Sequence, residues 1–173
     1  MDHRDVLIDF ANRQLYSMHV VLRGIADDAL HAMPLDRGNS VAWLVWHAAR
    51  QQDAQLAQLR GTPQLWDTGG WGERLGVPLD SDVSGFGHTQ SDVAALHVSS
   101  PEALQDYMAA VVEAVTQYVA TLFPEDLDEI VDTSWDPPVT RGVRLVSTVD
   151  DAIAHLAQAA YARGLVEGWR IGY

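Results

Sequence analysis

Two histidines stand within otherwise apolar helical segments, where an imidazole ring needs partners for both of its nitrogens. His47 lies in Trp43–Asp53, written WLVWHAARQQD, and His155 lies in Ile153–Gly164, written IAHLAQAAYARG. A buried ring nitrogen without a partner costs roughly 1–3 kcal/mol, so a protein group, a metal or a substrate must meet each ring. Histidines on two core-facing helices can converge on one point, and helical bundles build metal sites in this way. The alternative for each is a hydrogen-bonded core histidine.

Arg50 and Tyr161 are candidates for contact with a small-molecule ligand. Arg50 follows His47 by three residues and therefore lies beside it on the helix surface. A guanidinium can bind a carboxylate through two parallel hydrogen bonds, which suits an organic acid. The alternatives for Arg50 are a salt bridge to a neighbouring helix or a solvent-facing side chain, and the alternative for Tyr161 is simple packing.

Length, charge and cysteine content limit the class of protein. The chain has 173 residues, of which 47% are hydrophobic and 20% charged, so we expect one domain over residues 1–173. Its formal net charge of −13 argues against binding to nucleic acid or to an anionic membrane, because both require clustered positive charge. The absence of cysteine excludes disulfides, thiolate ligands and a cysteine nucleophile. Any metal site must therefore use His, Asp, Glu or water.

Targeting segments and several familiar catalytic motifs are missing from the sequence. The N-terminus, MDHRD, lacks a basic region followed by an apolar segment, and no apolar run approaches the roughly 20 residues of a membrane span. We therefore expect a cytoplasmic protein. The sequence also contains no Gly-x-x-x-x-Gly-Lys phosphate loop, no Gly-x-Ser-x-Gly elbow and no His-Glu-x-x-His motif.

Apolar residues at helical spacing and local capping signals predict four long helices. The expected ranges are about Asp5–Ile25, Val41 to about Arg60 with Asn39 or Ser40 as N-cap, Pro101 to about Leu122 after a Ser cap, and a last helix from the capping box Thr148–Asp151 to about Trp169. Residues 139–146 follow Pro137 and Pro138 and are expected to be extended.

A long connection separates the second and third of these helices. Residues 61–99 are rich in Gly, Pro, Asp and Trp and exceed the usual connection length, so we expect a functional or mobile segment with one short helix after Thr89. Such a connection can cross the bundle and leave its two flanking helices parallel. The expected fold is therefore all-α, a four-helix bundle with a long crossover between helices 2 and 3.

Four segments resemble the DinB-like superfamily of bacterial four-helix bundles, namely WLVWHAARQQD, SGFGHT, WDPPVTRGVRLVS and HLAQAAYARG. They extend over most of the chain and look especially like an actinobacterial branch of that superfamily, whose members include mycothiol-dependent maleylpyruvate isomerase. The resemblance implies a DinB-like bundle with a divalent metal such as zinc or nickel. It implies one histidine ligand from the second long helix, which falls on His47. It also implies a His-x-x-x-His pair in the last helix and an open position for water or a thiolate.

The pair in the last helix has no direct counterpart in this sequence. If His155 is its first member, the second place falls on Ala159. If the pair is instead aligned on the Arg-Gly that follows it in the family, its two places fall on Gln158 and Ala162. A methyl group cannot coordinate a metal, so either alignment requires another donor.

Three side chains are candidate replacements for the missing ligand. Asp151 precedes His155 by four residues and so lies on the same helical face. His88 lies in the Gly85–Thr89 loop, which can fold over the end of the bundle, and Gln158 offers a carbonyl oxygen, a weaker ligand than imidazole. The alternatives are a helix N-terminal residue favoured by the helix dipole for Asp151 and an ordinary loop side chain for His88.

Two functions are compatible with these observations. The first is a metal-assisted, thiol-dependent transferase or hydrolase of the DinB-like type with an altered metal site, formed by His47, His155 and a substitute donor. Arg50, Gln158 and Tyr161 would contact its small-molecule substrate, and a low-molecular-weight thiol such as mycothiol would be its cofactor. The second is a metal-free small-molecule-binding or stress-associated protein that has lost catalysis. In this alternative His47 and His155 are hydrogen-bonded to each other, to Gln158 or to water. A third, more general possibility is a bundle that serves mainly as a homodimer module, with apolar helix faces that exceed what one core needs. We expect a homodimer.

Overall fold

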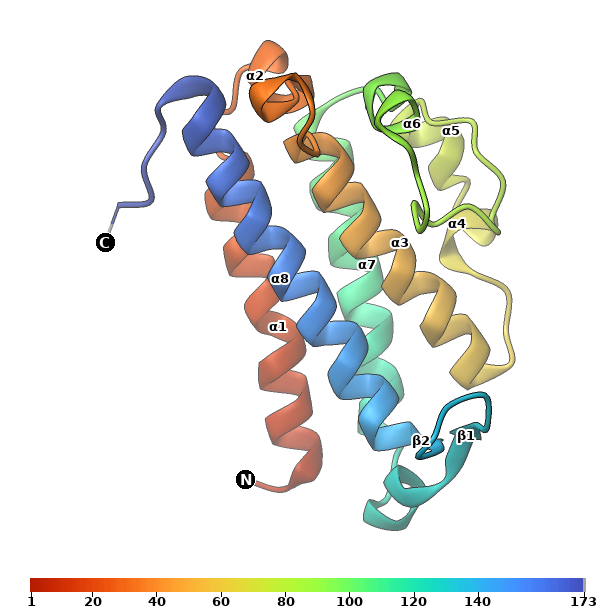
Figure 1. Ribbon diagram of the computed structural model, residues 1–173. Coiled ribbons are helices and arrows are strands. Elements are labelled where there is room, and N and C mark those ends of the chain that lie inside the picture. The colour runs from red at the N-terminus through yellow and green to blue at the C-terminus, as the bar shows by residue number, and fades with distance from the viewer. Residues whose placement is uncertain (173) are drawn as a thin grey trace.

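Four long helices form the body of the molecule in a computed structural model that describes residues 1–172 (Figure 1). They are α1 (His3–Leu22), α3 (Val41–Arg60), α7 (Pro101–Ala120) and α8 (Arg141–Glu167). Each follows a side chain that accepts a hydrogen bond from a backbone N–H of the first turn, and these caps are Asp2, Ser40, Ser100 and Thr140. Such a cap stabilises a helix by about 1 kcal/mol. The predicted four-helix bundle is confirmed.

The two helices on either side of the long connection are parallel neighbours. α3 and α1 each pack against both α7 and α8, so α1 and α3 are diagonal to one another. Tyr118 near the end of α7 donates to the carbonyl of Leu59 near the end of α3, which shows that these helices run the same way (Figure 1). Arg163 near the end of α8 likewise donates to the Val21 carbonyl near the end of α1. Residues 61–100 therefore cross the bundle, as the sequence predicts.

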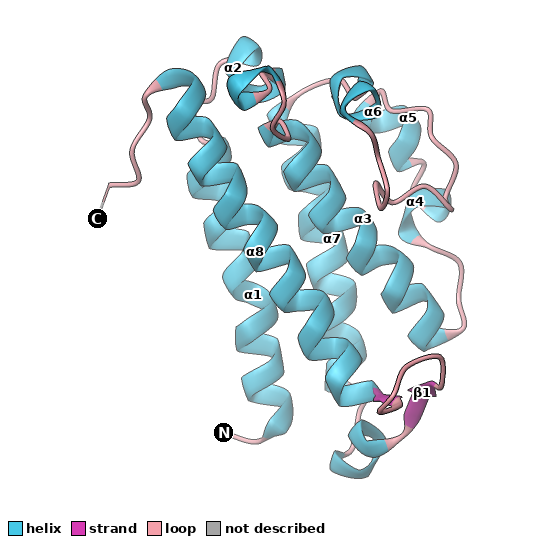
Figure 2. Ribbon diagram, viewed as in Figure 1, coloured by secondary structure: helices cyan, strands magenta, loops and turns pink. Residues whose placement is uncertain are grey.

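Short elements connect the long helices, and most of them are helical (Figure 2). They are α2 (Asp27–His31), η1 (Pro34–Asp36), α4 (Leu65–Thr68), α5 (Trp71–Leu75), α6 (Gln90–Ala95), η2 (Pro124–Asp128), β1 (Ile130–Asp132) and β2 (Val139–Thr140). β1 and β2 form one small antiparallel sheet beside the start of α8. α6 begins after Thr89 through a capping box with Asp92, as predicted. Among the described residues, no helix is long and apolar enough to cross a bilayer.

The start of the last helix is the main error of the sequence prediction. α8 begins at Arg141, seven residues before the capping box expected at Thr148, and only Val139 and Thr140 of the expected extended segment form a strand. The Thr148 hydroxyl donates to Oε1 of Gln51 at 2.9 Å instead of capping its own helix. A contact with another helix thus accounts for a residue that the local pattern assigned to a helix start.

α3 is the central helix of the bundle. Every residue from Val41 to Asp53 is buried, which explains the apolar character of the segment around His47. Four consecutive polar residues within it are each paired with a different neighbour. Their partners are Ser81 of the crossover for Arg50, Thr148 of α8 for Gln51, Gln14 of α1 for Gln52, and Tyr107 of α7 for Asp53. One turn of α3 therefore forms hydrogen bonds with the crossover and with each of the other three long helices.

Candidate metal centre

His47 from the middle of α3 and His155 from α8 meet between these two helices. Their rings lie edge to face, with centroids 4.7 Å apart. Asp151 stands one turn before His155 on α8, and its Oδ1 lies 3.6 Å from Nε2 of His155. One ligand atom from each of the three residues lies within 4.8 Å of the other two. The group thus combines two imidazoles and a carboxylate at a spacing that one metal ion can bridge.

The chain sets the tautomer of His47 through a backbone carbonyl. Nδ1 of His47 lies 2.5 Å from the carbonyl oxygen of Ser84. A carbonyl oxygen only accepts hydrogen bonds, so Nδ1 carries the proton and the neutral ring keeps a lone pair on Nε2. Burial lowers the pKa of His47, and the nearby His155 adds to that effect against the opposing Ser84 hydrogen bond. The neutral form, which is the one that binds metals, is therefore favoured.

Gln158 sets the tautomer of His155 as the Ser84 carbonyl sets that of His47. Nδ1 of His155 lies 2.9 Å from Oε1 of Gln158, three residues further along α8. The amide oxygen accepts this hydrogen bond, so Nε2 of His155 is again the nitrogen with the lone pair, on the side of Asp151. Partners of this type commonly orient metal-binding histidines. The structure therefore places Gln158 behind His155 rather than among the three potential ligands.

The structure shows which residue of α8 lies with His155 in this group. It is Asp151, four residues earlier on the helix. Ala159 and Ala162, the positions reached by the two alignments, are buried in the core with relative exposures of 0% and 4%. They have no part in the group.

A cleft of about 770 Å³ opens beside the three residues, and His47 and Asp151 form part of its wall. Most of the remaining wall consists of side chains with amides or hydroxyls. These include Gln51, Gln55 and Gln58 of α3, Ser81 and Ser84 of the crossover, and Ser147 of α8. Phe86 and Arg144 add an apolar and a basic group. A small polar molecule in this cleft would lie directly against His47 and Asp151.

Two other candidates from the sequence lie outside this group. Nδ1 of His88 accepts a hydrogen bond from Nε1 of Trp43 at 3.1 Å, and its ring stacks on Trp46. His88 is therefore bound into the aromatic layer that also contacts His47 through Trp43. Tyr161 is 72% exposed and lines a different groove, which lies beside Leu35.

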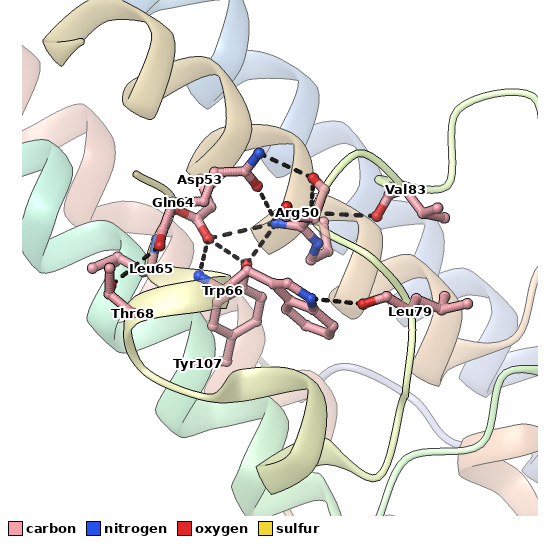
Figure 3. Close-up of polar contacts among 10 residues, drawn as sticks. Arg50, Asp53, Gln64, Leu65, Trp66, Thr68, Leu79, Val83 and Tyr107 are labelled. Carbon is pink, nitrogen blue, oxygen red and sulfur yellow. Dashed lines mark hydrogen bonds and ion pairs between the residues drawn. The ribbon is translucent and has the colours of Figure 1, made fainter. Parts of the chain in front are cut away.

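Arg50 is fully buried and binds protein groups (Figure 3). Nη1 donates to Oε1 of Gln64 at 2.9 Å, to the hydroxyl of Tyr107 at 3.2 Å and to Oδ2 of Asp53 at 3.5 Å. Its guanidinium also lies over the ring of Trp66, 4.6 Å from the centroid. Arg50 is absent from the wall of the cleft, so it is not placed as a ligand clamp there. Its ion pair is with Asp53 of its own helix and not with a neighbouring helix, and hydrogen bonds join it to α7 and the crossover.

Asp53 and Tyr107 complete this buried network, and sequence reasoning did not find them. The carboxylate of Asp53 accepts hydrogen bonds from the backbone N–H groups of Leu65 and Trp66, at 2.8 and 2.7 Å, and from the Tyr107 hydroxyl at 2.8 Å. Burial raises the pKa of Tyr107, and the adjacent Asp53 carboxylate raises it further. The only signal in the sequence is the spacing of an arginine and an aspartate three residues apart on a buried helix.

Comparison with known proteins places the chain in a family. Its fold matches that of a conserved protein from Enterococcus faecalis known from a crystal structure, with a TM-score of 0.88 and 34% sequence identity over 98% of this chain and 99% of the other. No curated protein matches the chain. The sequence description of the DinB superfamily matches residues 11–159, a range that includes His47, Asp151 and His155, and the chain belongs to that superfamily.

Proposed function

We propose that the protein binds one divalent metal ion through His47, Asp151 and His155 and acts on a small molecule held in the adjoining cleft. The observation that carries this proposal is the pair of hydrogen bonds behind the two imidazoles. Ser84 and Gln158 each accept a hydrogen bond from an Nδ1–H group, which leaves both Nε2 atoms as lone-pair donors beside the carboxylate of Asp151. Two histidines and a carboxylate bind zinc and non-haem iron in other proteins and leave coordination positions open.

The carboxylate distinguishes this centre from one with three histidines. Asp151 brings one negative charge, so the complex with a divalent ion has a lower net positive charge than an all-histidine centre. A carboxylate is also a harder donor than imidazole, which broadens the set of metals to manganese and iron besides zinc and nickel. The residues present therefore fit a divalent ion. Their ligand atoms are two imidazole nitrogens and a carboxylate oxygen instead of three imidazole nitrogens.

Each part of the site has a definite task in this proposal. A bound divalent ion supplies a Lewis acid that lowers the pKa of a water or thiol. The amides of Gln55 and Gln58 and the hydroxyl of Ser147 can both donate and accept hydrogen bonds, so they suit a polar ligand. Arg144 on the same wall pairs with Asp132 through Nη2 at 2.6 Å, and its remaining N–H groups can donate to an anionic group. The reaction proposed is a transfer or a hydrolysis, and a thiol such as mycothiol is the proposed co-substrate.

Metal content tests the proposal directly. The protein is purified without an affinity tag, incubated with zinc, nickel, manganese or ferrous iron, freed of excess metal and subjected to elemental analysis. We expect about one ion per chain in the wild type and substoichiometric metal in His47→Ala, Asp151→Asn and His155→Ala. His19→Ala, which removes an exposed histidine of α1, is the matched control and should retain the metal. A wild-type protein that retains none of these metals would refute the proposal and favour the metal-free binding function.

A further inference from the structure

We infer that Arg50 and Gly85 are positioning residues for His47, because together they hold the crossover segment Asp80–His88 so that the Ser84 carbonyl meets Nδ1. The inference rests on the proposed function, since His47 is one of the proposed ligands. It assigns a task to a fully buried arginine and to a glycine that neither the metal nor the substrate would contact.

The contact to be positioned comes from the backbone of the crossover. Ser84 lies in the part of the crossover without helical hydrogen bonds, between α5 and α6. Its carbonyl oxygen lies 2.5 Å from Nδ1 of His47, and its location depends on the path of the chain rather than on a rotamer. If this segment moved away, the neutral ring could take either tautomer, and one of the two tautomers places a proton on Nε2.

Hydrogen bonds hold the segment on both sides of Ser84. On the N-terminal side, Nη2 of Arg50 donates to the carbonyls of Ser81 at 2.8 Å and Val83 at 3.3 Å. On the C-terminal side, Nε1 of Trp43 donates to Nδ1 of His88. Arg50 thus fixes the backbone at the residue immediately before Ser84, and α3 supplies all three side chains concerned, including His47 itself.

Arg50 is rigid enough for this task. Asp53, Gln64 and Tyr107 hold its other terminal nitrogen, and the Trp66 ring covers its face (Figure 3). The side chain has a relative exposure of 0%, so these charge-assisted hydrogen bonds do not compete with solvent. The network therefore holds the crossover segment in a fixed position relative to α3.

Gly85 provides the space for the close approach. Its φ of +96° is a conformation that side chains with a Cβ rarely adopt. A Cβ at this position would lie 2.9 Å from Nδ1 of His47 and 2.9 Å from the ring of Trp46. Any larger residue would therefore push the segment away from His47 or turn the imidazole.

Gly87 offers a matched control in the same segment. Its φ is +77°, so alanine is strained there as well, but a Cβ at Gly87 would meet no atom within 4 Å. Gly85→Ala and Gly87→Ala therefore share the backbone strain and differ in the contacts with His47 and the two adjacent tryptophans, Trp43 and Trp46.

The first measurement uses metal-free protein and does not depend on metal binding. Long-range ¹H–¹⁵N NMR of the histidine rings reports which nitrogen of His47 carries the proton. We expect the Nδ1–H tautomer in the wild type and in Gly87→Ala, and a mixture or the Nε2–H tautomer in Gly85→Ala. Arg50→Lys, which keeps the charge but loses the two-carbonyl contact, should shift the tautomer in the same direction.

The second measurement is the zinc affinity of the same variants by competition with a chromophoric chelator. Loss of such an orienting partner typically weakens metal binding by about 10–100-fold, and we expect this for Gly85→Ala and Arg50→Lys but not for Gly87→Ala. An unchanged His47 tautomer in Gly85→Ala, or equal changes in both glycine variants, would overturn the inference. A normal tautomer pattern with no zinc binding in the wild type would instead refute the proposed function and leave the positioning role of the segment intact.

Discussion

Replacing Tyr107 with phenylalanine removes one oxygen atom from the buried network that joins α3, α7 and the crossover. That oxygen donates a hydrogen bond to Oδ2 of Asp53 at 2.8 Å and accepts one from Nη1 of Arg50 at 3.2 Å. Tyr107 is fully buried, so water cannot easily replace the lost contacts. Because burial raises the pKa of its hydroxyl well above the usual value, the group remains a donor at all pH values suitable for the experiment.

The expected loss of stability follows from the partners that remain. A hydrogen bond to a charged group contributes about 1.5–3 kcal/mol, and the substitution removes two of them. Asp53 keeps the N–H groups of Leu65 and Trp66, and Arg50 keeps Gln64, so neither ion is left without a partner. We therefore expect Tyr107→Phe to lower the free energy of unfolding by about 2–3 kcal/mol, less than the sum of two full contributions.

Urea unfolding followed by circular dichroism measures this loss. The midpoint should fall while the dependence on urea stays unchanged, and the melting temperature should fall by about 4–12 °C for a chain of this size. Tyr16→Phe, at a side chain that is 75% exposed on α1, should change stability by less than about 0.5 kcal/mol. A loss as small as this in Tyr107→Phe would refute the view that the network stabilises the bundle.

Two further perturbations test the bundle and the candidate centre. In metal-free protein the free energy of unfolding should fall as the pH drops below about 6.5, because the unfolded chain protonates His47 while burial lowers the pKa of this residue in the folded state. His47→Gln should weaken this dependence, and identical pH profiles for the two proteins would contradict it. Thr148→Val removes a buried hydroxyl that donates to Gln51 at 2.9 Å and should cost about 1–2 kcal/mol in thermal or urea unfolding. Thr116→Val serves as its control and should have a smaller effect, because the Thr116 hydroxyl on the partly buried side of α7 donates only to the Glu113 carbonyl of its own helix.

Local signals were sufficient to predict most of the fold. The cap at Ser40 and the glycine at residue 61 bound α3 within one residue of its observed ends, and Ser100 with Pro101 did so for the start of α7. The signal at Thr148 was misleading because its hydroxyl serves a neighbouring helix, which no local pattern reveals.

The candidate centre was predictable only in part. His47 and His155 are conspicuous because their neighbours are apolar, and Asp151 shares a helical face with His155. The choice of Asp151 over His88 required the structure, since the position of a loop histidine depends on the path of the crossover. The Ser84 carbonyl has no side-chain signal at all, and Asp53 meets Tyr107 across more than fifty residues of chain.

The turn of α3 from Arg50 to Asp53 has a consequence for the order of the helices. Apolar side chains attract any apolar surface, so many arrangements of the same helices around α3 would bury similar areas. Exchanging α1 and α8 would separate Gln52 from Gln14 and Gln51 from its α8 partner, and each unpaired buried amide would cost roughly 1–3 kcal/mol. The hydrogen bonds therefore raise the free energy of the wrong helix arrangements by more than they lower the free energy of the native one. The polar residues of this turn therefore determine the order of the helices around α3. The apolar residues around them determine only that the helices associate.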